Sequence, residues 1–392
     1  MTAPIPFFSA GFRPMFLGAA LWAAASMLLW VLFWTGFTEW SPAWTPLDWH
    51  VHELLFGYGG AVLAGFLLTA IPTWTGRAPV SGWPLAGLFL VWLLGRLTVI
   101  AALGLPAAVT TLLALAFPVT FTLTAAYEVT RGGNWRNLPV ILLCAGFTLA
   151  NLLFLLAAQE AAPVDTALGA RIGLAVLILL ISLIGGRIVP LFTRNWIRRH
   201  QISAPQPPEF GPVDGAVLMT STATLFLWCA LPDHAATGAA MILLGLAHLW
   251  RMSRWQGLRT LRDPLLSGLH MGYGFVPLGC VLTGLAALSD QVDPVAGLHA
   301  WTAGAIGTMT LTVMARASLG HSGRALTATP VEWFYLTAIV ASGVCRILSA
   351  LGLFSTPLLH LSASLWILAF LAFALRFLPV MLQPRLPSGT EA

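Results

Sequence analysis

The sequence contains no lysine, and only 8% of its 392 residues are charged. A soluble globular chain carries roughly 25% charged residues, so this chain has too little charge to cover a water-exposed surface of its size. Hydrophobic residues make up 58% of it. These figures exclude a soluble globular protein. They predict an all-α integral membrane protein whose surface is covered mostly by lipid.

Cysteine is scarce as well. Cys144, Cys229, Cys280 and Cys345 each lie in an apolar run, and no Cys-x-x-Cys pair occurs. This pattern excludes a thiolate metal site and a disulfide framework, and it predicts small buried side chains. The net charge of +5 comes from arginines spread over short connections. Because these arginines form no basic face or stripe, nucleic acid is excluded as a partner.

Long apolar stretches dominate the rest of the chain. A transmembrane helix needs about 20 residues at 1.5 Å each, and about twelve stretches approach or exceed that length. They lie near 16–37, 53–72, 84–104, 107–127, 138–158, 168–190, 215–231, 236–250, 264–287, 296–316, 331–350 and 357–378. The first stretch has neither a basic leader nor a cleavage site, so we expect a retained span. Residues 1–392 are predicted to form one transmembrane bundle, in which an inner connection at about 194–214 separates spans at about 16–190 from spans at about 215–378.

The charges of the connections alternate along the chain. One set of connections carries Arg13, Arg77, Arg131, Arg136, Arg194, Arg198, Arg199, Arg251, Arg254, Arg259, Arg262, Arg324 and Arg385. The other set carries Glu39, Asp48, Glu160, Asp165, Asp233, Asp290 and Asp293, and only Arg171 breaks the pattern. Because basic connections stay in the cytoplasm, we expect a bacterial inner-membrane protein with both termini cytoplasmic.

Two of the expected spans resemble each other. His52 is followed after 5, 8, 24 and 25 residues by three glycines and Arg77, and His299 is followed at the same offsets by three glycines and Arg324. The span near 168–190 ends similarly, in Gly185-Gly186-Arg187, but has no histidine. The echo favours a pseudo-repeat of three blocks of four helices.

Three histidines are predicted to lie at one depth near the outer surface. His50 and His52 open one span, and His299 lies in the first turn of another. Imidazole ligates both haem iron and copper, so His52 and His299 could bind one haem from two helices, while His50 supports that site or binds copper. If the segment is helical, His50 and His52 point about 200° apart and cannot share an ion. Asp48 or Glu53 could orient an imidazole.

A second site is predicted near the inner surface. His270 lies inside a span, and His321 follows another span in a Gly-His-Ser-Gly-Arg turn. Together with Arg77 or Arg324 they could hold a cofactor or a substrate anion, although a structural hydrogen-bonded turn explains His321 equally well. The remaining histidines, His200, His234, His248 and His360, are expected to be ordinary interfacial residues.

Charge inside the expected spans is almost entirely basic. Arg96, Arg187 and Arg346 should face the bundle interior, where an anion or helix carbonyls can satisfy them. No carboxylate stands at the centre of an expected span. This absence argues against a cation antiporter or proton pump, which usually needs one there.

Long motifs run along nearly the whole chain. They are Phe12-Arg13-Pro14, Trp49-His50-Val51-His52-Glu53, Trp74-Thr75-Gly76-Arg77, Gly185-Gly186-Arg187, Leu269-His270 with Gly272-Tyr273, Leu298-His299, and Arg316 with Ser318-Leu319-Gly320-His321-Ser322-Gly323-Arg324. With these motifs the chain resembles the NnrS family. The resemblance implies a haem- and copper-containing bacterial membrane protein linked to denitrification and to nitric oxide resistance.

The resemblance also implies which residues serve the cofactors. Metal-binding positions would be His50, His52, His270, His299 and His321, and cofactor-binding arginines would be Arg13, Arg77, Arg187, Arg316 and Arg324. We therefore expect a protein that binds nitric oxide and reduces or detoxifies it. If it reduces nitric oxide, it would be a nitric oxide reductase-like oxidoreductase that takes electrons from an unidentified donor. The alternative is a membrane transporter for copper or a metal-linked small molecule. The absence of Met-x-x-Met clusters weighs against it.

Overall fold

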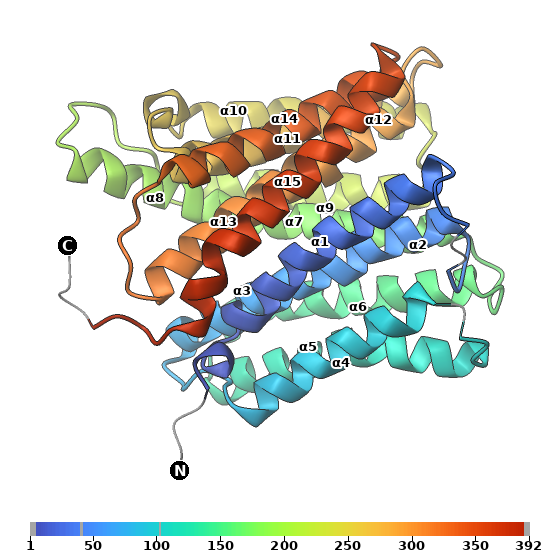
Figure 1. The fold of residues 1–392 in the computed structure, drawn as a ribbon. Coiled ribbons are helices and arrows are strands. Elements are labelled where there is room, and N and C mark those ends of the chain that lie inside the picture. The colour runs from blue at the N-terminus through green and yellow to red at the C-terminus, as the bar shows by residue number, and fades with distance from the viewer. Residues whose placement is uncertain (1–4, 40–41, 102, 388–392) are drawn as a thin grey trace. The chain divides into compact units, whose positions relative to one another are not determined.

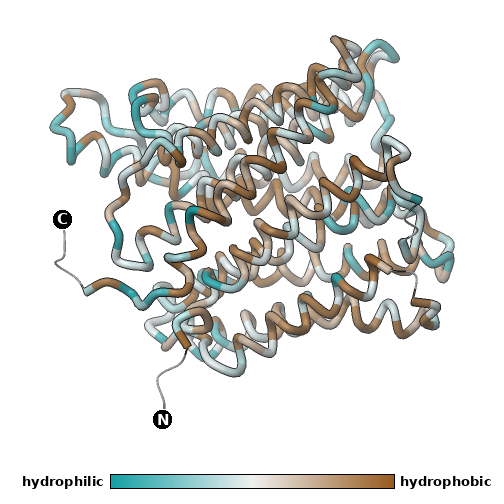
Figure 2. Tube along the Cα trace, in the orientation of Figure 1, coloured by the Kyte–Doolittle hydropathy of each residue, from teal (hydrophilic) through white to brown (hydrophobic). Residues whose placement is uncertain are grey.

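The computed structural model describes residues 5–39, 42–101 and 103–387. All regular structure in this part of the chain is helical, and no strand occurs in it (Figure 1). The hydropathy colouring of Figure 2 is apolar along the helices and more hydrophilic at many of the turns between them. The prediction of an all-α polytopic membrane bundle is confirmed.

Eleven helices in the described residues are long and apolar enough to cross a membrane. They are α1 (Phe12–Trp34), α2–η2–α3 (Pro46–Thr75), α4 (Trp83–Ile100), α5 (Ala107–Arg131), η3–α6 (Trp135–Ala158), α7–η4–α8 (Thr166–Arg199), α9 (Pro212–Ala230), α10 (Ala235–Ser253), α11 (Pro264–Ala286), α14 (Pro330–Ala350) and α15 (Ser355–Leu382). The two shortest expected spans, 215–231 and 236–250, are α9 and α10.

The remaining expected span, 296–316, lies in a further continuous helix. This helix comprises α12 (Pro294–His299), η6 (Ala300–Ile306) and α13 (Gly307–His321). At 1.5 Å per residue it is longer than the roughly 30 Å hydrocarbon core. It is rich in glycine, alanine and threonine and is not among the eleven apolar spans. Its crossing of the membrane therefore stays a prediction.

Two compact units make up the chain. The first unit comprises Met1–Val176, Met314–Ala325 and Phe370–Ala392, and the second comprises Leu177–Val313 and Leu326–Ala369. In the first unit α4 packs against α5, α5 against α6, and α1 against α3. In the second unit α10 packs against α9 and α11, and α11 also packs against α14.

Helix α11 is buried along most of its length because its neighbours in the second unit approach it very closely. A methyl group at Gly284 would lie 2.6 Å from the carbonyl oxygen of Gly238 on α10. A methyl group at Gly272 would lie 2.8 Å from the backbone nitrogen of Met309 on α13. Glycine is required at both positions, because any side chain would push the helices apart.

The two segments that resemble each other in sequence also share a local structure. His52 ends α2 and is followed by the π-helix η2 (Glu53–Tyr58), and His299 ends α12 and is followed by the π-helix η6. Each segment then continues as an α-helix. Gly76, with a φ of 69°, directly follows α3, and Gly323, with a φ of 75°, lies two residues after the end of α13. A third π-helix, η4 (Ile181–Gly185), precedes Gly186 and Arg187. The three-fold pseudo-repeat itself stays a prediction.

Candidate functional site

A buried carboxylate in the first unit organises the polar side chains around His52. Glu53 Oε1 accepts hydrogen bonds from His52 Nδ1 at 2.7 Å and from Arg96 Nη1 at 2.5 Å, and Glu53 Oε2 accepts one from Trp22 Nε1 at 2.7 Å. On its other side, His52 Nε2 lies 2.9 Å from Asn151 Oδ1. We call these five residues the Glu53 cluster.

Charge pairing explains how the Glu53 cluster is tolerated inside a membrane helix. Glu53 and His52 are completely buried and Arg96 is 1% exposed. An isolated charge in such a place would be very costly, but here the carboxylate has a guanidinium and two further donors. Arg96 faces the interior of its unit as predicted, and its partner is a carboxylate. The helix begins at Pro46, not near residue 53, so Glu53 lies about two turns inside it.

The orientation of His52 follows from its neighbour. Of the two carboxylates that were expected to orient an imidazole, Glu53 contacts His52, whereas Asp48 Oδ2 accepts a hydrogen bond from the hydroxyl of Thr45, the residue that caps the helix. The segment is helical, so His50 points elsewhere. Its ring stacks on Trp30 with centroids 4.4 Å apart. The helical alternative therefore holds, and His50 and His52 do not converge on one ion.

A second buried network lies in the second unit. Arg251 Nε donates to Asp214 Oδ1 at 2.7 Å, and Arg251 Nη1 donates to the Tyr273 hydroxyl at 2.9 Å. Tyr273 Oη lies 2.9 Å from His248 Nδ1, and His248 Nε2 lies 3.0 Å from Ser221 Oγ. Because arginine can only donate, the Tyr273 hydroxyl proton is free to point at His248 Nδ1. We call these five residues the Arg251 cluster.

Two expectations are corrected by the Arg251 cluster. His248 was expected at the membrane interface, but it is fully buried because Tyr273 and Ser221 satisfy both ring nitrogens. Arg251 was expected in an inner connection, but it lies in the last turn of α10 and is fully buried. It also donates to the carbonyl oxygen of Ser182, inside the π-helix η4, at 2.9 Å. A π-helix displaces backbone carbonyls from the regular ladder, and Arg251 binds one of them.

His270 has one satisfied and one unsatisfied ring nitrogen. Its Nε2 lies 2.9 Å from Thr193 Oγ1, which itself donates to the carbonyl oxygen of Val189 at 2.8 Å. Nε2 therefore carries the proton, and Nδ1 carries a lone pair. That Nδ1 is buried and has no hydrogen-bond partner. It faces Gly257, where a methyl group would lie only 2.7 Å away.

The other two predicted histidine ligands lie at helix ends. His299 is in the second unit, and its Nδ1 lies 2.9 Å from the carbonyl oxygen of Val295, one turn back. His321 is in the first unit, at the end of α13, with its ring 6.1 Å from that of Phe12. His52 and His321 thus belong to one unit, and His270 and His299 to the other.

The predicted arginines have different kinds of partner. In the first unit Arg13 donates to three carbonyl oxygens at the end of α15, and Arg324 donates to Gln383. Arg316 lies half-buried on α13. In the second unit the Arg187 guanidinium lies over the Phe210 ring, 4.9 Å from its centroid.

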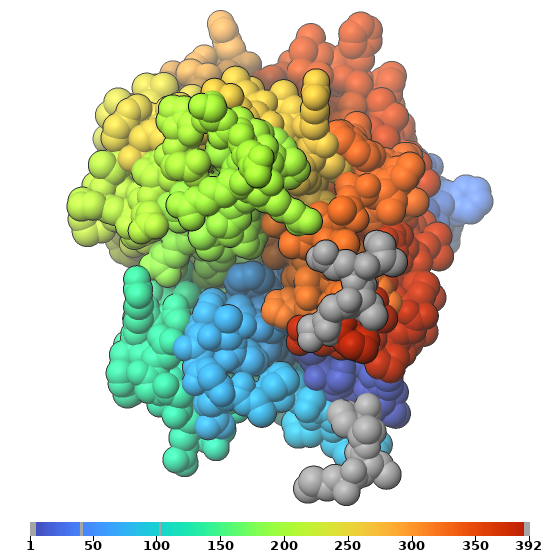
Figure 3. Space-filling view, turned by 90° about the vertical axis from the view of Figure 1, so that its left-hand side faces the viewer, coloured from blue at the N-terminus to red at the C-terminus, as the bar shows by residue number. Residues whose placement is uncertain are grey.

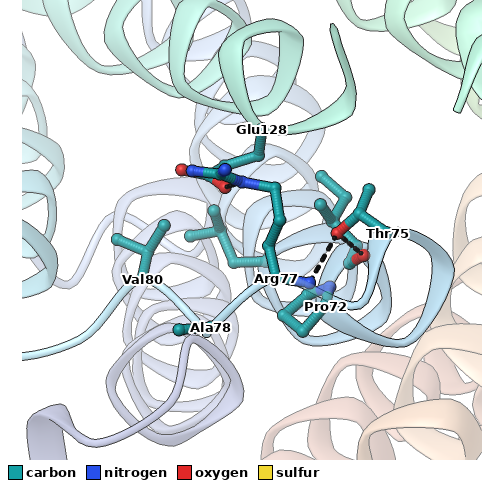
Figure 4. A pocket seen from close by; sticks show the side chains of 8 residues that line it. Pro72, Thr75, Arg77, Ala78, Val80 and Glu128 are labelled. Atoms are coloured by element: carbon teal, nitrogen blue, oxygen red, sulfur yellow. Dashed lines mark hydrogen bonds and ion pairs between the residues drawn. The ribbon is translucent and has the colours of Figure 1, made fainter. Parts of the chain in front are cut away.

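Arg77 lines a small cavity that is shown in Figure 4. Its Nε donates to Glu128 Oε2 at 2.6 Å, which ties the turn after α3 to α5. The hydrogen bond that Arg77 donates to this carboxylate raises the pKa of Arg77. The cavity holds about 10 Å³, which is room for one water molecule. It is too small for a cofactor.

No group of three or more His, Cys, Asp or Glu side chains converges as a metal site in the described residues. A copper ion held by protein alone usually needs such a group. A haem iron takes four ligands from its porphyrin and needs only one or two histidines, so the absence of such a group among the described residues does not bear on haem.

These observations define a polytopic helical membrane protein with buried, paired charges and with histidines in both of its units. Residues 6–385 match the family described as NnrS protein. Because the match spans nearly the whole chain, the protein belongs to the NnrS family. No curated protein is similar enough to the chain to match it.

Proposed function

We propose that the protein is a haem- and copper-containing membrane protein that binds nitric oxide and reduces or detoxifies it. Membership of the NnrS family supports the link to nitric oxide. Ferrous haem with an open coordination position would supply the binding chemistry for nitric oxide, and copper could stabilise a reduced N–O species.

The observation that carries the proposal is the orphaned Nδ1 of His270. A buried imidazole nitrogen without a partner is disfavoured unless something binds it. The hydrogen bond from Nε2 to Thr193 fixes the ring and leaves Nδ1 as the ligating atom. Metal-bound histidines are commonly oriented in this way, by a hydrogen bond from the ring nitrogen that does not bind the metal. The glycine at position 257 keeps side chains away from that atom. His270 therefore fits a metal or haem ligand.

His299 fits a ligand for a similar reason. Its Nδ1 lies 2.9 Å from the carbonyl oxygen of Val295, and this contact orients the ring, as hydrogen bonds do for metal-bound histidines. His52 fits less well, because both of its ring nitrogens have protein partners. It could bind a metal through Nε2 only after Asn151 moved away. We keep His50 and His321 as proposed copper or haem ligands, and Arg187 and Arg316 as proposed partners of anionic cofactor groups.

The test compares two buried histidines of the second unit. His270→Gln removes the proposed ligand, whereas His248→Gln is the matched control, since both nitrogens of His248 have protein partners. Haem and copper per folded protein and the optical spectrum are measured, with and without nitric oxide. We expect His270→Gln to lose a cofactor or to shift the haem bands, and His248→Gln to keep both.

The same measurements decide against the proposal if wild-type protein contains neither haem nor copper. Unchanged cofactor content, spectrum and nitric oxide response in His270→Gln would remove His270 from the site. His52→Ala and His299→Ala variants, measured in the same way, test whether these two histidines bind one haem. The transporter alternative predicts copper flux into proteoliposomes, without a spectral response to nitric oxide.

A further inference from the structure

Basic side chains gather in the first unit around the end of α15. They are Arg13, His321, Arg324, Arg376 and Arg385, and we call them the C-terminal basic cluster. Their side chains are close enough for their charges to interact. The interacting pairs are Arg324 with Arg13, Arg376 with Arg324, and Arg385 with His321. They come from the start of α1, from the end of α13 and the turn after it, and from α15 and the residues that follow.

Backbone contacts hold these segments together. Arg13 Nη1 donates to the carbonyl oxygens of Val380, Met381 and Gln383 at 3.1, 2.8 and 2.5 Å. The backbone nitrogen of Leu386 donates to the carbonyl oxygen of Ser322 at 3.0 Å. In Figure 3 the red end of α15 lies beside orange residues. The cluster is therefore a fixed arrangement of the chain.

Carboxylates pair with other arginines of this unit. Arg96 pairs with Glu53 and Arg77 with Glu128. Among the residues that the structure describes, no carboxylate forms an ion pair with Arg13, Arg324 or Arg385.

The guanidinium of Arg324 is only partly satisfied. Its Nη2 donates to Gln383 Oε1 at 2.7 Å, but its Nη1 is buried and has no hydrogen-bond partner. Burial lowers the pKa of Arg324, and the charge of Arg376 lowers it further. A group of like charges with an unused donor is stabilised when an anion binds.

The surroundings favour a lipid over a free anion. Helix α15 is long and apolar enough to cross the membrane and ends at Leu382, so a cluster at this end of it would lie near the depth of the lipid phosphates. Exposed leucines lie beside it, with Leu378 41%, Leu382 53% and Leu386 38% exposed. An acyl chain can cover these side chains, whereas an inorganic anion cannot.

We propose that the C-terminal basic cluster binds the phosphate of an anionic phospholipid, with acyl chains against the leucines at the end of α15. Guanidinium groups suit this ligand because they donate two parallel hydrogen bonds to phosphate oxygens. Basic pockets between membrane helices bind lipid headgroups in this way. The proposal goes beyond the proposed function, shares only His321 with the proposed metal and haem ligands, and assigns Arg376 and Arg385 a role.

The test is lipid-dependent thermal unfolding of the detergent-purified full chain. Phosphatidylglycerol, phosphatidylcholine with the same acyl chains, and inorganic phosphate are titrated separately at constant ionic strength. The double variant R376Q/R385Q is compared with wild type and with R136Q, which removes an exposed arginine from a basic connection outside the cluster.

We expect phosphatidylglycerol to raise the unfolding temperature of wild type and R136Q more than phosphatidylcholine does. R376Q/R385Q should lose at least half of that difference. If the double variant does not fold, R385Q alone is compared in the same way. Equal stabilisation of all variants, or of wild type by the zwitterionic lipid, would overturn the proposal. Stabilisation by inorganic phosphate as large as by phosphatidylglycerol would overturn the assignment to a lipid.

Discussion

Arg251 and Asp214, 37 positions apart in sequence, form an ion pair of 2.7 Å in which both side chains are buried. Asp214 lies near the start of α9 and Arg251 near the end of α10. The two helices pack together and are joined by a short turn between Ala230 and Ala235, so they run antiparallel. A buried pair adds little stability by itself because both charges must leave water. Removing one partner is different, because the other charge then remains buried and unpaired.

This relationship gives the first prediction. Arg251→Met should destabilise the protein by up to about 3–5 kcal/mol, because buried Asp214 would lose its nearer counter-charge and keep only Arg254, whose Nη2 lies 3.4 Å from Oδ1. The double variant Arg251→Met with Asp214→Asn should recover much of that loss. Urea or SDS unfolding of wild type, both single variants and the double variant gives the coupling free energy. Strictly additive effects would show that the pair does not couple.

The second prediction compares the two glutamates of the first unit. Glu53→Gln should cost about 3–5 kcal/mol because Arg96 is buried against it. Glu128→Gln should cost far less, since the Arg77 side chain is 37% exposed and solvent screens the pair. The same unfolding assay measures both. Equal costs would contradict the account of the Glu53 cluster.

The fold was largely predictable because a bilayer dictates the length and the apolarity of each span. Boundaries were missed where polar residues open a helix. The helix that begins at Pro46 was expected to begin only near residue 53, because its first two turns contain the polar residues Asp48, His50, His52 and Glu53. Expected span 236–250 likewise stopped before Arg251, because a basic residue near a span end is typical of a connection.

The buried networks were not predictable from one sequence. Glu53 and Arg96 lie 43 positions apart, and nothing in the sequence says which helices pack together. Spacing did contain a weaker signal, since His248 and Arg251 are three residues apart and therefore share one helix face. The motif containing Tyr273 was noticed only through the family resemblance, and its contacts with both residues required the structure.

The third prediction concerns Gly186, whose backbone lies against the guanidinium of Arg251. A methyl group at Gly186 would overlap the guanidinium of Arg251, which contacts this helix through the Ser182 carbonyl. Gly186→Ala should therefore destabilise the protein by about 1–3 kcal/mol. Gly87→Ala on α4 is the control, since nothing lies within 4 Å of a methyl group there. It should be neutral or stabilising by about 0.5–1 kcal/mol. A stabilising Gly186→Ala would show that this contact is not close.

The last prediction concerns the twelfth crossing and the orientation in the membrane. Eleven spans put the two termini on opposite sides, whereas a membrane-spanning Pro294–His321 helix adds a twelfth and returns both termini to one side. Arginine-rich connections should then be cytoplasmic. Reporter fusions at 131–136, 194–214 and 324–329 should report the cytoplasm, and fusions at 160–165 and 290–293 should report the outside. The decisive comparison is between 290–293 and 324–329, which flank the helix directly. Reporters on the same side at those two positions would show that the helix does not cross, despite its length.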